Sequence, residues 1–409
     1  MPALTPQASA PSGLPRRGGS PFRSRQGHEA LILRLLCRHG PLTRTELGTL
    51  CGLSRTTLYN VVGALMDDGT IVASVPEAAQ RKRGRPAEML ALNSATGRLL
   101  GIEFARRAVR VATTNAAREI TRTAGEPHGP DTSWQARIDL AARLANELVG
   151  GALLPGTFRG VGVGVVGPVA SPERGPMSTP WHNTVSTLVR ERFGAQVLID
   201  NNTRLATLAE TIWGAAASEQ NVLYLRLSHG VGGGLVMGGT LHRGAHGRSG
   251  MFGHITVEPD GAPCACGGIG CLETVASIGA VLQAYRIAGG TAEDVPELVA
   301  AVESDDQAAH EVLAQAGGHV GRVLADMHHA VGPDMIVLGG ELLDAGRTLM
   351  APIEHILNTH AARCSHEVPR LVSAALGDSG TALGAIALLQ RNMTRGAPRQ
   401  QEGARVTLA

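Results

Sequence analysis

One histidine and three cysteines crowd into a short stretch of this chain, and their spacing constrains the fold more than any other feature. His254, Cys264, Cys266 and Cys271 follow the pattern H-x9-C-x-C-x4-C. Four nitrogen and sulfur ligands complete the tetrahedral coordination of zinc and leave no open position for an activated water molecule. The pattern therefore predicts a structural Zn²⁺ that holds an otherwise irregular loop on the body of the protein. The alternative is three unligated thiols beside a chance histidine.

Cysteine usage and apolar patterning indicate the compartment of the chain. Six cysteines in a chain of 409 residues do not form a disulfide framework, and three of them belong to the predicted metal site. No run of about 18 apolar residues is present, so the sequence predicts no membrane partner. The N-terminal arginines are not followed by the apolar stretch of a secretory signal. We therefore expect a cytoplasmic protein.

Length and charge indicate two main parts with different partners. A chain of 409 residues is too long for one ordinary domain. We expect a disordered basic arm over residues 1–27, a small domain over 28–93, a larger one over 94–391 and a flexible tail over 392–409. Residues 1–95 hold twelve Lys or Arg against six Asp or Glu, a net charge of +6, so the rest of this +2 chain carries −4. The basic first part points to a polyanionic partner.

The segment from Leu42 to Asp68 has the proportions of a helix-turn-helix. Thr43 and Glu46 form a capping-box pattern for a short helix that stops near Gly52, and a second helix follows from residue 55. That helix has an apolar face and polar side chains at its N-terminal end, as a recognition helix in the major groove requires. The residues predicted to contact DNA from this unit are Thr43, Arg44, Arg55, Thr56, Thr57, Tyr59 and Asn60.

Two β-prone stretches, residues 71–75 and 89–92, flank a basic loop that suits the wing of a winged helix-turn-helix. Its side chains Arg81, Lys82, Arg83 and Arg85 can lie along phosphates or enter a narrow minor groove. The alternative is a three-helix packing or protein-interaction module with a solvated basic loop. The charge of +6 favours a double-stranded DNA operator as the partner.

After residue 93 the pattern changes to strands that alternate with helices and glycine turns, which predicts an α/β domain. The predicted strands are residues 99–104, 109–113, 160–166, 197–200, 222–227, 234–237 and 335–338. The predicted helices include residues 132–149, 203–213, 276–288, 307–331 and 380–390. Two halves that each open with a pair of strands suit an actin-like body.

Several motifs of this α/β part resemble those of the ROK family (repressors, open reading frames and sugar kinases). Gly253-His254 with Cys264-Ala-Cys266-Gly-Gly-Ile-Gly-Cys271-Leu-Glu273 resembles the family's zinc signature, and Gly230-Val-Gly-Gly-Gly-Leu-Val resembles its glycine-rich signature. The resemblance spans about residues 95–390, and the basic first part is similar to the DNA-binding half of the family's repressors. It implies a two-lobed actin-like ATPase fold, a sugar ligand in the cleft, and a homodimer or homotetramer.

The same resemblance indicates that the kinase chemistry is lost. A sugar kinase needs a carboxylate to accept the proton of the hydroxyl that is phosphorylated. Family kinases use the Asp of an Asn-Asp pair, and the matching position here is Asn202, whose amide is no base. They also hold ATP phosphates with an Asp-x-Gly-Gly-Thr turn, which here is Glu103-Phe-Ala-Arg-Arg107. Without those glycines the backbone cannot approach a phosphate closely.

Effector contacts implied by the resemblance are Asn201, Asn202, His254 and Glu273. Family members use a Glu-x-Gly-His segment for the sugar, and Met251 replaces its Glu here. An altered ligand, a weakened one or none are all compatible with these changes. Glu273 has the alternative role of an acidic residue at the favourable end of a helix dipole.

Together these patterns predict a DNA-binding transcription regulator of carbohydrate-related genes, with repression as the family's default. Its zinc-stabilised, catalytically inactive kinase-like domain would bind a sugar or phosphosugar effector. One alternative is an active ROK sugar kinase that uses ATP. A second is a regulator titrated by a protein partner rather than by a sugar.

Overall fold

The computed structural model describes residues 28–394 except 30, 34, 37, 38, 68, 75–87, 94–97, 116–118, 152, 154–156, 170–179 and 364–366. The chain divides into two compact units, residues 1–93 and residues 94–409, called the head and the body below. The predicted basic arm and the four predicted wing residues at 81, 82, 83 and 85 lie outside the described residues.

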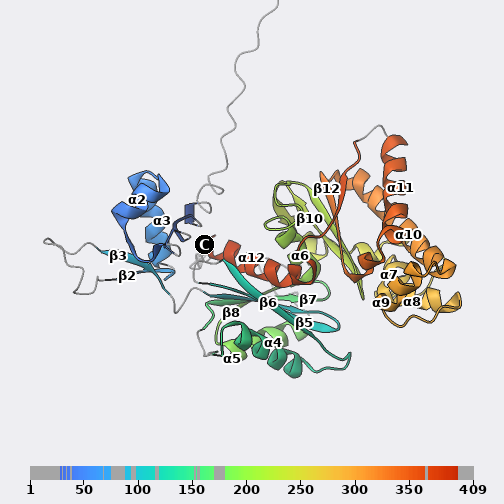
Figure 1. The fold of residues 1–409 in the computed structure, drawn as a ribbon, viewed down its shortest axis with the longest axis horizontal. Helices are drawn as coiled ribbons and strands as arrows, with labels where there is room; N and C mark the ends of the chain where they lie inside the picture. The colour runs from blue at the N-terminus through green and yellow to red at the C-terminus, as the bar shows by residue number, and fades with distance from the viewer. Residues whose placement is uncertain are drawn as a thin grey trace, which may run out of the picture. The chain divides into compact units, whose positions relative to one another are not determined.

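The head combines helices with a small antiparallel sheet (Figure 1). Described residues between 28 and 39 are helical, and α2 (Arg44–Cys51) and α3 (Arg55–Asp67) follow. The sheet has the order β1-β3-β2, from β1 (Leu42–Thr43), β3 (Met89–Leu92) and β2 (Ile71–Ser74). One apolar face of each helix turns inward, and the buried side chains of the head include Ile32, Leu33, Leu36, Leu47, Leu58, Val61, Val62, Leu65, Ile71 and Leu90.

Local sequence signals fix both ends of α2. The predicted capping box is present: the amide of Glu46 donates to Thr43 Oγ1, and the amide of Thr43 donates to the Glu46 carboxylate. The helix ends at Gly52, whose φ of 64° is in the left-handed region that favours glycine. The next helix starts directly afterwards, with the amide of Thr57 donating to Ser54 Oγ. The tight turn between α2 and α3 therefore follows from caps that are legible in the sequence.

The body contains two five-stranded mixed sheets with the same connectivity. The first has the order β6-β5-β4-β7-β8 and the second has the order β11-β10-β9-β12-β13. In each sheet the first three strands of the chain pair antiparallel and the last two join in parallel. The strands are β4 (Leu99–Phe104), β5 (Ala108–Thr114), β6 (Ile120–Pro127), β7 (Gly160–Val165), β8 (Gln196–Asn201), β9 (Val222–Leu227), β10 (Val231–Met237), β11 (Thr240–His242), β12 (Met335–Gly339) and β13 (Arg370–Ser373). This repeat of one topology is the two-lobed, actin-like arrangement.

Two helices lie between the sheets, α6 (Asn202–Glu210) and α12 (Gly380–Thr394) (Figure 1). One side of α12 packs on the first sheet and the other on the second. Glycines in the strands allow this close approach: a Cβ on Gly101 would lie 1.9 Å from the carbonyl oxygen of Ala382. A Cβ on Gly162 would lie 2.3 Å from the carbonyl oxygen of Ala385. Helix α12 also packs closely on α6, where a Cβ on Gly384 would lie 1.8 Å from the carbonyl oxygen of Leu205.

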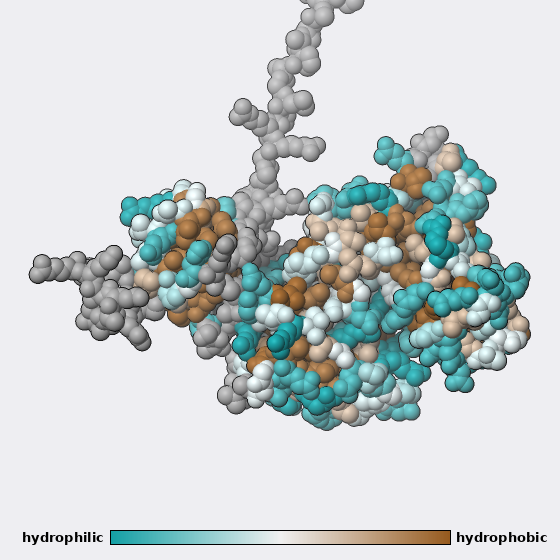
Figure 2. Space-filling model, in the orientation of Figure 1, coloured by the Kyte–Doolittle hydropathy of each residue, from teal (hydrophilic) through white to brown (hydrophobic). Residues whose placement is uncertain are grey.

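The outer faces of the sheets are covered by the remaining helices. In the first lobe α4 (Trp134–Leu148) and α5 (Pro180–Phe193) build a core with the inner strands. In the second lobe the covering helices are α7 (Glu273–Ala276), α8 (Ile278–Ile287), α9 (Val295–Glu303), α10 (Gln307–Val331) and α11 (Arg347–Arg363). Figure 2 shows hydrophilic and hydrophobic residues mixed over the visible face. Among the described residues, none of the helices has the length and apolar character that crossing a membrane requires.

Candidate functional site

A cleft of about 790 Å³ lies in the body and takes lining residues from both lobes. The first lobe contributes the β4–β5 turn, and the second contributes the β9–β10 turn and the cysteine-rich loop. All four predicted effector residues, Asn201, Asn202, His254 and Glu273, line this one cavity. Residues far apart in the sequence thus meet where the resemblance places the ligand.

The two asparagines stand at the start of α6. The Oδ1 of Asn201 caps the helix by accepting from the amide of Arg204 at 3.0 Å, and it also accepts from the hydroxyl of Thr203. Its amide nitrogen donates to the carbonyl oxygen of Gly167. The Oδ1 of Asn202 accepts from the amide of Thr203 at 2.9 Å. The acceptor atoms of both asparagines are therefore already engaged within the protein.

Directly behind them, a buried ion pair holds the end of β8. Arg204 is 1% exposed, and its Nε donates to Asp200 Oδ1 at 2.8 Å. Its two terminal nitrogens reach the carbonyl oxygens of Gly247 and Val169. Arg243 approaches the same carboxylate from the other side, at 2.8 Å from Oδ2. Arg204 thus ties one wall of the cleft to the other.

The Arg204→Met variant is expected to destabilise the protein by about 3–5 kcal/mol, because it breaks a buried ion pair and leaves two carbonyl oxygens without their donor. Arg243→Met is the matched control, since its side chain is 28% exposed and makes bonds only to Asp200 among the described residues. Chemical denaturation of both variants measures the difference. Equal losses of unfolding free energy would contradict the structural role assigned to Arg204.

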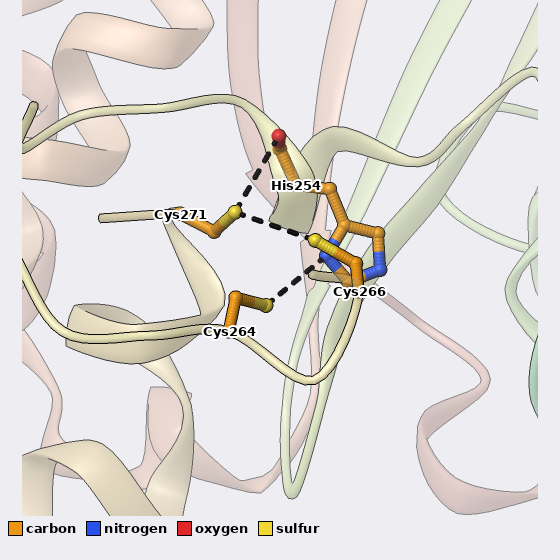
Figure 3. A group of neighbouring side chains, drawn as sticks. All are labelled: His254, Cys264, Cys266 and Cys271. Carbon is orange, nitrogen blue, oxygen red and sulfur yellow. Dashed lines mark hydrogen bonds between the residues drawn. The ribbon is translucent and has the colours of Figure 1, made fainter. Parts of the chain in front are cut away.

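The four predicted metal ligands meet in the second lobe (Figure 3). Their ligand atoms all lie within 4.8 Å of one another, and Cys271 is buried whereas Cys266 is exposed. Burial raises the pKa of the Cys271 thiol to about 12, while a hydrogen bond from the backbone of Gly268 lowers the pKa of Cys266. A buried thiol of this kind becomes a thiolate only beside a cation.

Distances within this cluster match the edges of a zinc tetrahedron. With Zn–S near 2.3 Å and Zn–N near 2.05 Å, the edges are about 3.8 Å for S···S and about 3.6 Å for S···N. Cys266 Sγ lies 3.7 Å from Cys271 Sγ, and Cys264 Sγ lies 3.6 Å from His254 Nδ1. A disulfide would bring two sulfurs to about 2.05 Å. The donor set and its spacing therefore fit Zn²⁺, with His254 contributing Nδ1.

His254 and Glu273 connect this cluster to the cleft. The imidazole of His254 lines the cavity while its Nδ1 faces Cys264 (Figure 3). Glu273 begins α7 two residues after Cys271, and its Oε2 accepts from the amide of Val231 at 2.8 Å. Its Oε1 lies 3.6 Å from Arg106 of the first lobe. Glu273 therefore has two partners inside the protein, the amide of Val231 and the guanidinium of Arg106, and it also stands at the start of a helix.

Beyond Glu273, the other half of the cleft contains a network of charges that crosses between the lobes. Glu103 of β4, whose side chain is fully buried, accepts from Arg226 of β9 at 2.8 Å and from Arg110 of β5 at 3.3 Å. Arg110 also pairs with Asp378 at 2.7 Å, and Glu341 lies 3.7 Å from both arginines. These five residues are called the cross-lobe network below.

The charges of this network stabilise one another. Burial disfavours the charged form of Arg226, but Glu103 and Glu341 more than offset it and raise the pKa. Burial likewise opposes ionisation of Glu341, yet Arg226 and other partners keep its pKa below the usual value. Three carboxylates and two guanidinium groups thus occupy the region next to residues 103–107. The charged groups in this region are therefore paired with one another within the protein.

Four of the seven described residues predicted to contact DNA lie on the exposed face of α3. Arg55, Thr56, Tyr59 and Asn60 are exposed, whereas Thr57 is half-buried with its hydroxyl 2.8 Å from that of Ser54. The apolar residues of the helix face the core of the head. The exposed set follows the i, i+4 spacing of one helix face.

Two predicted DNA contacts have partners within the head. Thr43 holds the capping box of α2. The guanidinium of Arg44 lies over the ring of Tyr59 at 4.8 Å and pairs with Glu88 at 3.2 Å. Arg44 therefore links α2, α3 and the residue before β3. Its contact with DNA stays a prediction, as do those of the other predicted residues.

Comparison with known proteins identifies both parts of the chain. The sequence profile of the ROK family matches residues 99–392. The chain belongs to the ROK family. The profile of a winged helix-turn-helix DNA-binding domain matches residues 30–72, so the chain joins a winged helix-turn-helix to a ROK body of actin-like fold. The predicted family and fold class are confirmed.

Curated relatives of this ROK protein include regulators matched over nearly their full length. The chain is 26% identical to the DNA-binding transcriptional dual regulator NagC of Escherichia coli K12, over 91% of this chain and 94% of the relative. It is 23% identical to the xylose repressor of Bacillus subtilis 168, over 87% and 93%.

Solved structures of the same family share the fold. A ROK family transcriptional regulator described as a homolog of the E. coli MLC protein superposes with a TM-score of 0.66 at 24% identity, over 91% of this chain and 97% of that one. The ROK hexokinase from Thermus thermophilus gives 0.59 at 28% identity, over 71% and 97%.

The sequence analysis did not predict the cross-lobe network or the buried ion pair of Arg204 with Asp200. Arg226 interrupts the otherwise apolar strand β9, and Arg110 interrupts β5, a signal for a buried charge with a partner. The partner could not be named, because Arg226 and Glu103 lie 123 positions apart.

Proposed function

We propose that this ROK protein is a DNA-binding transcription regulator, a repressor of carbohydrate-related genes, whose body binds an effector and does not phosphorylate it. The observation that carries the proposal is the winged helix-turn-helix joined to the ROK body, with the polar face of α3 exposed. Relatives with this pairing along nearly their whole length carry the names of regulators and repressors.

The chemistry of the cleft supports a body without kinase activity. The position of the expected proton acceptor is Asn202, and an amide cannot accept the hydroxyl proton. Next to residues 103–107, where family kinases hold ATP phosphates, the cross-lobe network pairs Arg226 with a fully buried carboxylate. Because Glu103, Glu341 and Asp378 already pair with Arg110 and Arg226, these two guanidinium groups would attract a triphosphate less than unpaired ones.

We further propose that His254, Cys264, Cys266 and Cys271 hold one structural Zn²⁺. We also propose the domain limits predicted from the sequence and a homodimer or homotetramer as the assembly. The imidazole of His254 would bind zinc through Nδ1 and leave its other edge to the cleft. Zinc would thereby fix the position of an effector-contacting side chain. Effector binding would favour one arrangement of two heads on a palindromic operator.

The proposal is tested by a fluorescence shift with the full chain and duplex DNA from its own upstream region, at physiological salt with excess random duplex. We expect saturable binding that one member of a sugar and phosphosugar panel changes. In parallel, ATP consumption with glucose, N-acetylglucosamine or xylose is expected to equal the rate without sugar. Sugar-dependent ATP consumption without specific DNA binding would contradict the proposal and indicate an active sugar kinase. Specific DNA binding that no panel member changes would favour control by a protein partner.

A further inference from the structure

The two sheets of the body each carry one charged residue at the same position of their first strand. Glu103 is the fifth residue of β4 and Arg226 is the fifth residue of β9, and the other residues of both strands are uncharged. β4 and β9 hold matching places in the two sheets, since each pairs antiparallel with the next strand and parallel with a later one. The two charges are opposite in sign, and Arg226 Nη1 lies 2.8 Å from Glu103 Oε1. The lobes therefore meet through equivalent residues of an internal repeat.

This ion pair is buried, and attraction between its charges outweighs the cost of burying them. The side chain of Glu103 is fully buried and that of Arg226 is 9% exposed. Burial disfavours the charged guanidinium, but Glu103 and Glu341 act in the opposite direction, and the pKa of Arg226 rises overall. A pair buried in this way is screened little by salt. It therefore ties the first lobe to the second more strongly than an exposed pair would.

A second contact joins the lobes near the same place. Arg106 belongs to the turn between β4 and β5, and its Nη2 lies 3.6 Å from the carboxylate of Glu273 in the second lobe. Its Nη1 donates at 3.4 Å to the carbonyl oxygen of His229, in the turn between β9 and β10. Residues of both turns line the cleft. Because the side chain of Arg106 is half exposed, this contact is the weaker of the two.

Elsewhere the lobes are joined through α6 and α12, which pack on both sheets with apolar side chains. Apolar packing is not directional, and packed helices can slide by small amounts. This packing alone does not fix how far apart the two turns stand. The ion pairs between the turns supply the directional contact across the cleft.

We propose that Glu103 and Arg226 form a latch that holds the two lobes of the body closed over the cleft, with Arg106 as a weaker contact beside it. Closure is then set by the charges of the protein itself, and opening requires the two charges to separate. The inference concerns the body and goes beyond the proposed function, because it holds whether or not the head binds DNA. A broken latch raises the population of an open body in which both turns are exposed together.

The test is hydrogen–deuterium exchange of the full chain, followed by mass spectrometry of peptides that cover the two turns, residues 104–109 and 227–232. The rates are compared under conditions in which exchange is proportional to the open population. We expect Arg226→Met to speed the exchange of both turns at least about tenfold, because it removes one partner of a buried ion pair. Peptides from the buried face of α10 should keep the wild-type rate, which separates opening of the cleft from a general loss of stability.

Two further variants and a control connect the effect to the pair. Glu103→Gln keeps the size of the side chain and is expected to speed the exchange of the same two turns. The double variant Glu103→Gln/Arg226→Met should exceed the larger single effect only slightly, because the two side chains act as a unit. Arg143→Met is the matched control: its ion pairs with Glu126 and Glu147 stay within the first lobe, so both turns should keep the wild-type rate.

Arg106→Gln extends the test to an exposed position that folding does not depend on. It is expected to speed the exchange of both turns about twofold to fivefold, as the loss of an exposed ion pair implies. Wild-type exchange of the two turns in every folded variant overturns the latch. Faster exchange of α10 to the same degree as the turns also overturns it, because the pair would then stabilise the fold as a whole and not the closed cleft.

Discussion

The Cys271→Ala variant is expected to lose bound zinc, from about one ion per chain to none, and to melt at a markedly lower temperature. Cys271 is 1% exposed, and its Sγ lies against the other ligands of the cluster. Structural zinc sites of this kind have apparent binding free energies on the order of 10–16 kcal/mol in isolated peptides, part of which stabilises the folded state. The loop between η4 (Phe252–His254) and α7 contains two isolated β-bridges but no long helix or strand, so zinc would add a constraint that regular secondary structure does not supply there.

Metal analysis of protein prepared without chelators or metal-affinity columns measures the zinc content, and calorimetry measures the melting temperature. Cys51→Ala is the matched control, because Cys51 is a half-buried thiol of the head outside the cluster. The control should keep its zinc. Wild-type protein without zinc, or a Cys271→Ala variant that retains it, would contradict the assignment of these four ligands. The loss should also abolish the response to effector, since His254 lines the cleft.

The parts of the fold that the sequence predicted well are those fixed by local signals. The capping box at Thr43 and the left-handed Gly52 give α2 its limits, and α10 begins and ends at the predicted residues 307 and 331. Strands buried on both faces, such as β4 and β9, show as apolar runs that contain a single charged residue. In each of these elements the residues that decide the structure lie within a few positions of one another.

Elements that tertiary packing stabilises escaped prediction. Strand β6 alternates weakly and is largely solvent-exposed at the edge of its sheet, so its side chains carry little pattern. Helix α11 contains Pro352, which in a sequence indicates a helix break. The short edge strands β11 and β13 also lacked a sequence signal. The helix predicted over residues 276–288 corresponds to α8, which begins only at Ile278 because Ser277 has extended backbone and caps it through the amide of Ala280. The short helix α7 was not predicted.

The candidate site shows the same division. The metal ligands were predictable because their spacing is local and their chemistry is specific. The cross-lobe network was not, because pairs such as Arg226 with Glu103 form only when the two lobes meet. Arg44 shows how burial changes an expected role: a basic residue at the start of α2 suits a phosphate, yet its guanidinium stacks on Tyr59 and pairs with Glu88. Pattern alone does not distinguish a side chain that supports the recognition helix from one that contacts DNA.

The recognition helix leads to the second prediction of large effect. The double variant Arg55→Ala/Asn60→Ala is expected to lower the affinity for the specific operator by about a hundredfold or more, because a good bidentate contact to a base contributes about 1–3 kcal/mol. Both side chains lie on the exposed face of α3, opposite the apolar residues that face the core. Their removal should leave the stability of the head nearly unchanged. A dimer would lose these contacts in both half-sites.

Single variants separate base contacts from phosphate contacts by their salt dependence. If Asn60 reads a base, Asn60→Ala weakens the operator but not random duplex, and the slope of log K against log salt stays the same. If Arg55 contacts a phosphate, Arg55→Ala weakens both duplexes and reduces that slope by about one. Thr49→Ala is the control in the head, because Thr49 is exposed on α2 and its hydroxyl donates within its own helix to the carbonyl oxygen of Thr45. Operator affinity unchanged in the double variant would mean that α3 is not the element that reads the DNA sequence.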